Sequence, residues 1–162
     1  KKTGAGKAQP HIPHSPFRLL FLGRFVGFKT LPALIDALFA LPDCTLTLCG
    51  GGPMEDTLRG HMCTRALTKR IAFLPILRGE KKVQLLTEHD LLVLPSLTEL
   101  SPTTALEARA VGLPVLLTEE TGLSSALTQG MVLAKLRTPA EILEAIRAIK
   151  ASDEYPELIC LD

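Results

Sequence analysis

Short apolar runs alternate with segments of helical periodicity along nearly the whole chain, and this alternation constrains the fold more than any other feature. The apolar runs are typical of strands that are buried on both faces. The first intervening segment places apolar residues at 31, 34, 35, 38 and 41, which is the spacing of one helix face. Such alternation indicates a parallel sheet with helices on both sides. We therefore predict an α/β fold with a Rossmann-like, doubly wound parallel sheet.

The expected elements follow one another through most of the chain, and the last helix has the clearest start signal. Thr138 precedes it and Glu141 lies three positions on, which is the pattern of a capping box. We expect a turn or short helix near residues 123–127. The expected strands are 17–22, 44–49, 70–74, 90–95, 114–118 and 131–134, and the expected helices are 30–41, 54–67, 80–89, 101–111 and 139–150.

The two ends of the chain differ from this pattern. Residues 1–16 hold three prolines and two glycines without periodicity, and we interpret them as a linker or leader. Residues 17–150 form the predicted domain, and residues 151–162 form an acidic tail with four acids and no base. The chain has no initiator Met, so we expect a fragment or processed product. Gly4-Ala-Gly-Lys7 lacks the phosphate-loop pattern and no strand precedes it, so we predict no phosphate site there.

Composition excludes several classes of protein. The net charge is +1, so bulk charge does not favour nucleic acid. No apolar run approaches the roughly 18 residues of a spanning helix. A hydrophobic content of 46% with a mean hydropathy of +0.25 suggests that part of the surface faces another domain. The four cysteines lack C-x-x-C spacing, which favours buried reduced thiols in a cytosolic protein over a zinc site or disulfides: Cys44, Cys49, Cys63 and Cys160.

Two carboxylates eight positions apart, Glu99 and Glu107, lie on either side of an expected helix start. Glu99 follows the apolar run 90–95, at the end of a strand where open α/β sheets bind ligands. Ser101 is a natural N-cap, and Pro102 suits the first turn. An alternative interpretation makes Glu99 a loop acid and Glu107 a solvated helix residue.

The start of this helix also predicts an anion site. The backbone N–H groups of Thr103 and Thr104 would have no helical partners, and the helix dipole adds positive charge there. Helical side chains lean toward the N-terminus, so Glu107 would point back toward this site. A ligand with hydroxyls on both sides of a phosphate would meet both carboxylates, and a nucleotide sugar is such a ligand.

Several motifs, taken in order from Phe17 to Ile149, resemble those of a known enzyme family. They are Leu22-Gly23-Arg24 followed by Lys29, Cys49-Gly50-Gly51-Gly52-Pro53, Ile71-Ala-Phe-Leu-Pro-Ile-Leu77, Glu99-x7-Glu107, and Gly112-Leu-Pro-Val115 with the glycine turn at Gly122. This order resembles the C-terminal, nucleotide-sugar-binding half of retaining glycosyltransferases with the two-Rossmann-domain (GT-B) architecture, family 4, or glycosyl transferases group 1.

The resemblance implies a role for each motif residue. Arg24 and Lys29 would hold the diphosphate, and Glu99 would meet the sugar hydroxyls, so these three are the predicted catalytic residues. Glu107 would accept hydrogen bonds from the ribose hydroxyls, as an ionised carboxylate suits a vicinal diol. The complete predicted donor-binding set is Gly23, Gly51, Gly52, Leu77, Ser101, Thr103, Thr104 and Glu107.

Two positions depart from the family pattern. Thr30 stands where the family usually has Gly, which could alter the helix start. Pro75 also replaces a usual Gly and removes an N–H, which leaves Ile76 and Leu77 as candidates for the base contact. The chain has no D-x-D motif, so we predict no metal, with the cations and the helix N-terminus in its place. The four histidines are interpreted as structural or exposed.

The function predicted from the resemblance is the donor half of a retaining, metal-independent glycosyl transfer. The enzyme would be a hexosyltransferase-type protein that is inactive as this isolated domain. It would need no cofactor beyond a nucleoside-diphosphate sugar as donor substrate. The acceptor, a lipid-linked sugar, glycan or protein, would bind a missing N-terminal domain. We expect a cytoplasmic protein, with any membrane association carried by that domain. The alternatives are a non-catalytic interaction domain and a sugar-nucleotide epimerase of the same architecture.

Overall fold

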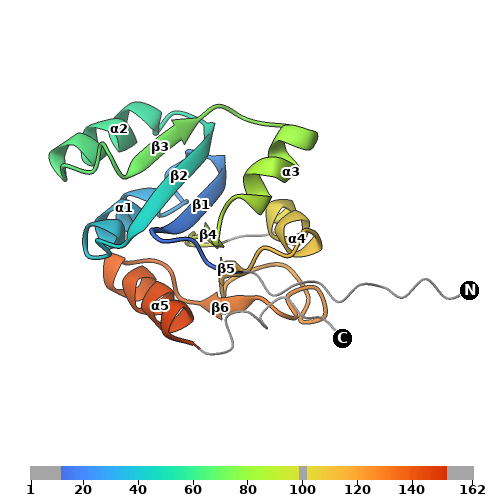
Figure 1. Cartoon of the computed structure of the whole chain (residues 1–162). Coiled ribbons are helices and arrows are strands. Elements are labelled where there is room, and N and C mark those ends of the chain that lie inside the picture. Colours follow the sequence, from blue (N-terminus) through green and yellow to red (C-terminus); the bar gives the residue numbers. More distant parts are fainter. Residues whose placement is uncertain (1–11, 99–101, 153–162) are drawn as a thin grey trace, which may run out of the picture.

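The part of the chain that the structure describes folds around one six-stranded sheet in which all strands are parallel (Figure 1). A computed structural model describes residues 12–98 and 102–152. The spatial order of the strands is β3-β2-β1-β4-β5-β6, so the chain reverses direction across the sheet between β1 and β4. The strands are β1 (Phe17–Arg24), β2 (Cys44–Gly51), β3 (Ile71–Leu74), β4 (Leu91–Leu94), β5 (Val115–Thr118) and β6 (Val132–Ala134).

Among the described residues, five helices cover the two faces of this sheet. Right-handed crossovers place α1 and α2 on one face and α3 and α4 on the other. The last helix, α5, returns to the first face and packs against α1. This is the predicted doubly wound fold. The helices are α1 (Leu31–Phe39), α2 (Glu55–Thr64), α3 (Glu80–Thr87), α4 (Thr103–Ala110) and α5 (Pro139–Ala151).

The expected boundaries agree with the structure to within a few residues, and the reasons are local. Every residue of β4 and β5 is buried, which explains their unbroken apolar sequences. The capping box at α5 is present, with the Thr138 side chain accepting from the Glu141 N–H. Residues 123–127 form turns rather than a short helix.

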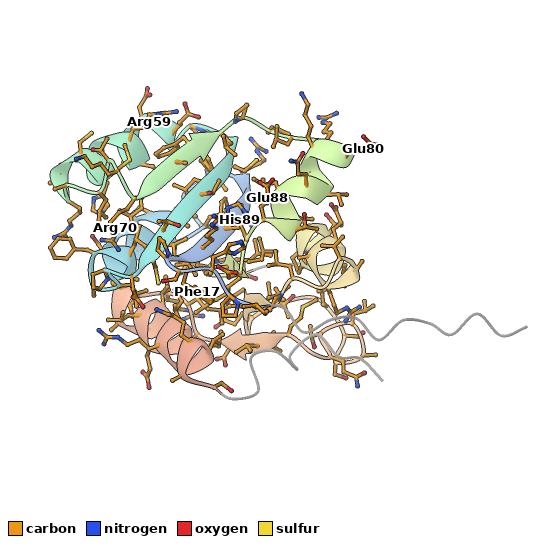
Figure 2. The ribbon with its side chains drawn as sticks, viewed as in Figure 1. Phe17, Arg59, Arg70, Glu80, Glu88 and His89 are labelled. Atoms are coloured by element: carbon orange, nitrogen blue, oxygen red, sulfur yellow. The ribbon has the colours of Figure 1, made fainter. Side chains whose placement is uncertain are left out.

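Arg70 ties together three elements at the amino edge of the sheet, the edge where the strands begin (Figure 2). Its guanidinium donates to the carbonyl oxygens of Leu38 at 2.8 Å and Cys44 at 3.2 Å, and also to Leu41. The carbonyls of Leu38 and Leu41 lie at the end of α1 and just after it, and that of Cys44 lies at the start of β2. A cation at the end of a helix interacts favourably with the helix dipole.

A buried carboxylate, Asp90, anchors the amino end of β4 at the same edge. It accepts hydrogen bonds from the backbone N–H of Arg18 at 2.8 Å and from the backbone N–H of His14 at 3.1 Å. The His14 ring nitrogen Nδ1 lies 2.8 Å from the same carboxylate. The segment before β1 is therefore bonded directly to β4, and this acid serves the fold rather than a ligand.

His89 is buried beside Asp90, and its hydrogen bonds define its tautomer (Figure 2). Nδ1 lies 2.7 Å from the Leu85 carbonyl oxygen, which can only accept, so Nδ1 carries the proton. Nε2 lies 2.8 Å from Thr47 Oγ1 and accepts from that hydroxyl in the neutral ring. Burial lowers the pKa of His89 below its ordinary value of 6.5. The histidine is a structural residue, as predicted.

The lowered pKa of His89 makes stability depend on pH. Below about pH 6.5 the unfolded chain binds a proton at this position more readily than the folded protein, so the free energy of unfolding falls as the pH is lowered. His89→Gln removes the titrating imidazole. The free energy of unfolding should then fall less steeply as the pH is lowered, by up to roughly 1.4 kcal/mol per pH unit. Urea midpoints of both proteins at about pH 7.5 and about pH 5.5 measure the difference. An equal decrease of the midpoint between these two pH values in both proteins would contradict this role for His89.

Candidate functional site

The predicted site lies at the carboxyl edge of the sheet, where β1 and β4 are neighbours and their connections run in opposite directions. Open α/β sheets form a ligand crevice at such a reversal point. Arg24 is the last residue of β1, is exposed, and pairs in register with Gly51 of β2. Within the described part of the chain, its guanidinium has no acidic partner. Its charge is therefore available to an anion at this edge.

The loop after β4 is bonded to the loop after β1. The Leu97 N–H donates to the Phe28 carbonyl oxygen at 2.9 Å. The buried Ser96 hydroxyl lies 3.1 Å from that oxygen and 2.6 Å from the Thr98 carbonyl oxygen. These contacts hold the segment before α4 against the segment that carries Arg24 and Lys29. The two halves of the predicted donor site are thus adjacent.

The glycine turn after β2 packs directly on the turn after β1. Gly50 has φ 148°, and a Cβ there would lie 1.9 Å from the Gly23 carbonyl oxygen. Gly52 has φ 153°, and its Cβ would lie 2.7 Å from the Phe25 carbonyl oxygen. The Phe25 N–H donates to the Gly51 carbonyl at 3.0 Å. Gly50 and Gly52 are therefore required by this packing, whereas a Cβ at Gly51 would meet no atom within 4 Å.

Phe25 is the side chain that fixes this turn to the core. It is fully buried, and its ring centroid lies 6.2 Å from that of Phe21 and 6.1 Å from that of Phe73. Its carbonyl accepts from the Met54 N–H at 3.0 Å, just before α2. Because this ring is buried, the preceding residue, Arg24, lies on the solvent side of the edge, where it is exposed.

Lys29 and Thr30 lie at the start of α1. The Lys29 ammonium is 5.4 Å from the centroid of the Phe28 ring, within the range of a cation–π contact. Thr30 has φ −80°, so this position does not require the glycine that is usual in the family. Its hydroxyl donates to the Leu136 carbonyl oxygen at 2.6 Å, which links the start of α1 to the loop before α5. The departure at Thr30 leaves the helix start intact.

The predicted acidic motif is described in part. Glu99 and Ser101 lie outside the described residues, and α4 begins at Thr103 with Pro102 in the N-cap position. Among the described residues, the backbone N–H groups of Thr103 and Thr104 have no hydrogen-bond partner. Glu107 is on α4, and its Oε2 is 2.7 Å from the ammonium of Lys82 on α3. Figure 1 shows these two helices side by side.

The segment after β3, which is predicted to contact the nucleobase, begins with Pro75. The Pro75 carbonyl oxygen accepts from the Cys49 thiol at 3.1 Å, which joins the ends of β2 and β3. Burial raises the pKa of that thiol. Leu77 is partly buried against the core, whereas Ile76 is 62% exposed. Of these two candidates for a base contact, Ile76 has the freer side chain.

Lys82 is a residue at this edge that the sequence analysis missed. Its position on α3 matches no motif, and the contact with Glu107 depends on how α3 lies against α4. No local signal in the sequence indicates that contact. Within residues 12–98 and 102–152, no group of three or more acids, histidines and cysteines could hold a metal ion.

An apolar groove elsewhere on the domain shares no residue with the predicted site. It has a volume of about 530 Å³ and lies between the edge strand β6 and α5. Its lining includes the apolar Val132, Ala134, Ala145 and Ile149, together with the polar residues Lys135, Glu141, Glu144 and Ser152. It offers no cluster of cations for a diphosphate, so its chemistry differs from that of the carboxyl edge.

Comparison with known proteins decides the family. The family model of glycosyl transferases group 1 matches residues 5–159. This chain belongs to that family. The group 1 domain is 33% identical over 151 residues to a D-inositol 3-phosphate glycosyltransferase of Geodermatophilus obscurus, an alignment that covers 84% of this chain and 34% of the relative. The chain thus spans about a third of the length of the curated relatives it matches.

Solved structures share the fold of this group 1 domain. The Anabaena Alr3699/HepE protein, solved in complex with UDP and glucose, superposes with a TM-score of 0.75 at 21% identity, covering 88% of this chain and 41% of that one. The C-terminal domain of a Francisella tularensis group 1 family protein, LpcC, superposes with a TM-score of 0.73 at 20% identity, covering 91% and 82%. In the described residues, no helix of the domain is long and apolar enough to cross a membrane.

The glycine turn provides a direct test of how this edge is built. Gly50→Ala should lower the free energy of unfolding by about 3 kcal/mol, because the added Cβ meets backbone and φ is unfavourable. Gly51→Ala, one residue on, meets open space and should stay within about 0.5 kcal/mol of the wild type. Urea unfolding of the two variants measures both values. Similar losses in both would show that the turns after β1 and β2 do not pack as described.

Proposed function

We propose that this group 1 domain binds a nucleoside-diphosphate sugar at the carboxyl edge of its sheet. The observation that carries the proposal is the junction of the loops after β1 and β4 at the carbonyl of Phe28, four residues after exposed Arg24. A relative with the same fold was solved with UDP and glucose, which supports a ligand of this class.

In this proposal, positive groups at the end of β1, before α1 and at the start of α4 share the diphosphate. Arg24 ends β1, Lys29 precedes α1, and the backbone N–H groups of Thr103 and Thr104 open α4. A guanidinium binds phosphate oxygens in a forked geometry, and a helix N-terminus adds N–H donors and a positive dipole. Together these groups would stabilise the charge on a departing diphosphate without a metal ion.

The proposed reaction is a retaining transfer. The C1–O bond to the diphosphate breaks through an oxocarbenium-like state, and the acceptor hydroxyl attacks C1 from the same face. The departing phosphate takes the proton of that hydroxyl, so no carboxylate nucleophile of the protein is needed. Glu99 would bind the sugar hydroxyls in this scheme and Glu107 the ribose hydroxyls.

The acceptor would be held by another part of the protein. Because the chain spans about a third of its curated relatives, we propose that an N-terminal domain supplies the acceptor site and any membrane contact. The donor domain alone would then bind nucleotide without transferring sugar. The described cysteines, Cys44, Cys49 and Cys63, are unbridged, which supports a reducing, cytoplasmic setting.

Glu107→Ala tests the proposed ribose contact. Loss of a charged hydrogen-bond acceptor should weaken nucleotide binding by about 1.5 to 3 kcal/mol. Isothermal titration of UDP, GDP and ADP, and of their sugars, against the wild type and the variant gives this difference.

The matched control is Glu144→Ala, which removes an exposed acid of the same charge from α5. It should leave the affinity for the nucleotide unchanged. Absence of binding by the wild type at millimolar concentration would overturn the donor-site proposal. An equal loss in Glu107→Ala and Glu144→Ala would show that net charge, rather than a ribose contact, governs binding.

A further inference from the structure

The ion pair between Lys82 and Glu107 joins two helices at the proposed donor edge. Lys82 Nζ lies 2.7 Å from Glu107 Oε2, a distance typical of a charge-assisted hydrogen bond. The Lys82 side chain is 25% exposed and that of Glu107 is 44% exposed. The lysine is thus the more enclosed partner, and the carboxylate faces the solvent side of the pair.

This pair contributes little to the stability of the fold. An ion pair between partly exposed side chains is worth about 0 to 1 kcal/mol. The helices are held in place by buried residues on their inner faces, Leu85 and Leu86 on α3 and Ala105 and Ala108 on α4. The effect of the lysine is therefore to restrict where the Glu107 carboxylate lies.

The positive charge of Lys82 also acts on Cys49, near the end of β2. Burial raises the pKa of the Cys49 thiol, and the positive charge of Lys82 acts in the opposite direction. Cys49 pairs with Leu22 of β1 and precedes Gly50, so the ammonium acts on the end of β2 as well as on α4. One cation therefore forms an ion pair with α4 and acts electrostatically on the end of β2.

A carboxylate held at one oxygen presents the other in a defined position. Lys82 occupies Oε2 of Glu107, and Oε1 has no hydrogen-bond partner among the described residues. We propose that Lys82 is a positioning residue of the donor site, which orients Glu107 so that Oε1 accepts from a ribose hydroxyl. This inference rests on the proposed function. It predicts that ribose recognition, more than phosphate recognition, depends on Lys82.

The experiment compares Lys82→Met, which keeps the aliphatic stem, with Lys82→Arg, which keeps the charge. The matched control is Lys81→Met, because Lys81 is the preceding, exposed residue of α3 and has no ion pair among the described residues. The probe is whichever of UDP, GDP and ADP binds the wild type, together with its 2′,3′-dideoxyribose counterpart. Amide spectra and thermal midpoints confirm that each variant is folded.

Lys82→Met should weaken binding of the ribonucleotide about fivefold and leave the dideoxy counterpart nearly unchanged, because only the former uses Glu107. Lys82→Arg should restore most of the affinity, and Lys81→Met should match the wild type. In a Glu107→Gln background, Lys82→Met should have almost no further effect, because the two residues act through one contact.

Each contrary outcome has a separate meaning. The positioning role would be overturned in favour of a direct phosphate contact by either of two results. One is an equal loss of affinity for the ribonucleotide and its dideoxy counterpart, and the other is a full effect of Lys82→Met in the Glu107→Gln background. No effect of Lys82→Met would overturn it outright. If the wild type binds none of the three nucleotides, the proposed function fails, and with it the ligand on which this inference depends.

Discussion

The site depends on the close approach of backbone segments at the carboxyl edge of the sheet. The turn after β2 can lie on the turn after β1 only because Gly50 and Gly52 have no side chains. Hydrogen bonds from Phe25 to Gly51 and from Leu97 to Phe28 then join three strand ends. Buried Phe25 holds this assembly on the core, so the neighbouring Arg24 is kept at the surface. The packing of Phe25 thereby determines where the charge of Arg24 lies.

The two edges of the sheet use polar groups in different ways. At the amino edge, buried Asp90 and His89 and the guanidinium of Arg70 are engaged by protein groups, chiefly backbone atoms. Their hydrogen bonds stabilise the fold. At the carboxyl edge, Arg24 and the N–H groups that open α4 have no such partners among the described residues. Unmatched positive groups at a strand reversal are what a diphosphate requires.

The architecture could be predicted because it is determined by local patterns. The continuous apolar runs of β4 and β5 and the capping box at Thr138 depend only on nearby sequence. The family is confirmed by the match over residues 5–159, whereas the roles that its motifs predict for Arg24 and Glu107 stay predictions. Two features could not be predicted. The structural need for Gly50 and the contact of Lys82 with Glu107 both arise from elements that meet only in the folded chain.

The central claim is that a nucleotide binds at the carboxyl edge of the sheet. Mapping amide chemical shifts of the ¹⁵N-labelled protein during titration with UDP, GDP or ADP tests it most directly. We predict shifts at Gly23, Gly51 and Thr103, and unchanged positions for Arg70 and Asp90 at the amino edge. Shifts centred on the amino edge, or on the groove between β6 and α5, would contradict the account.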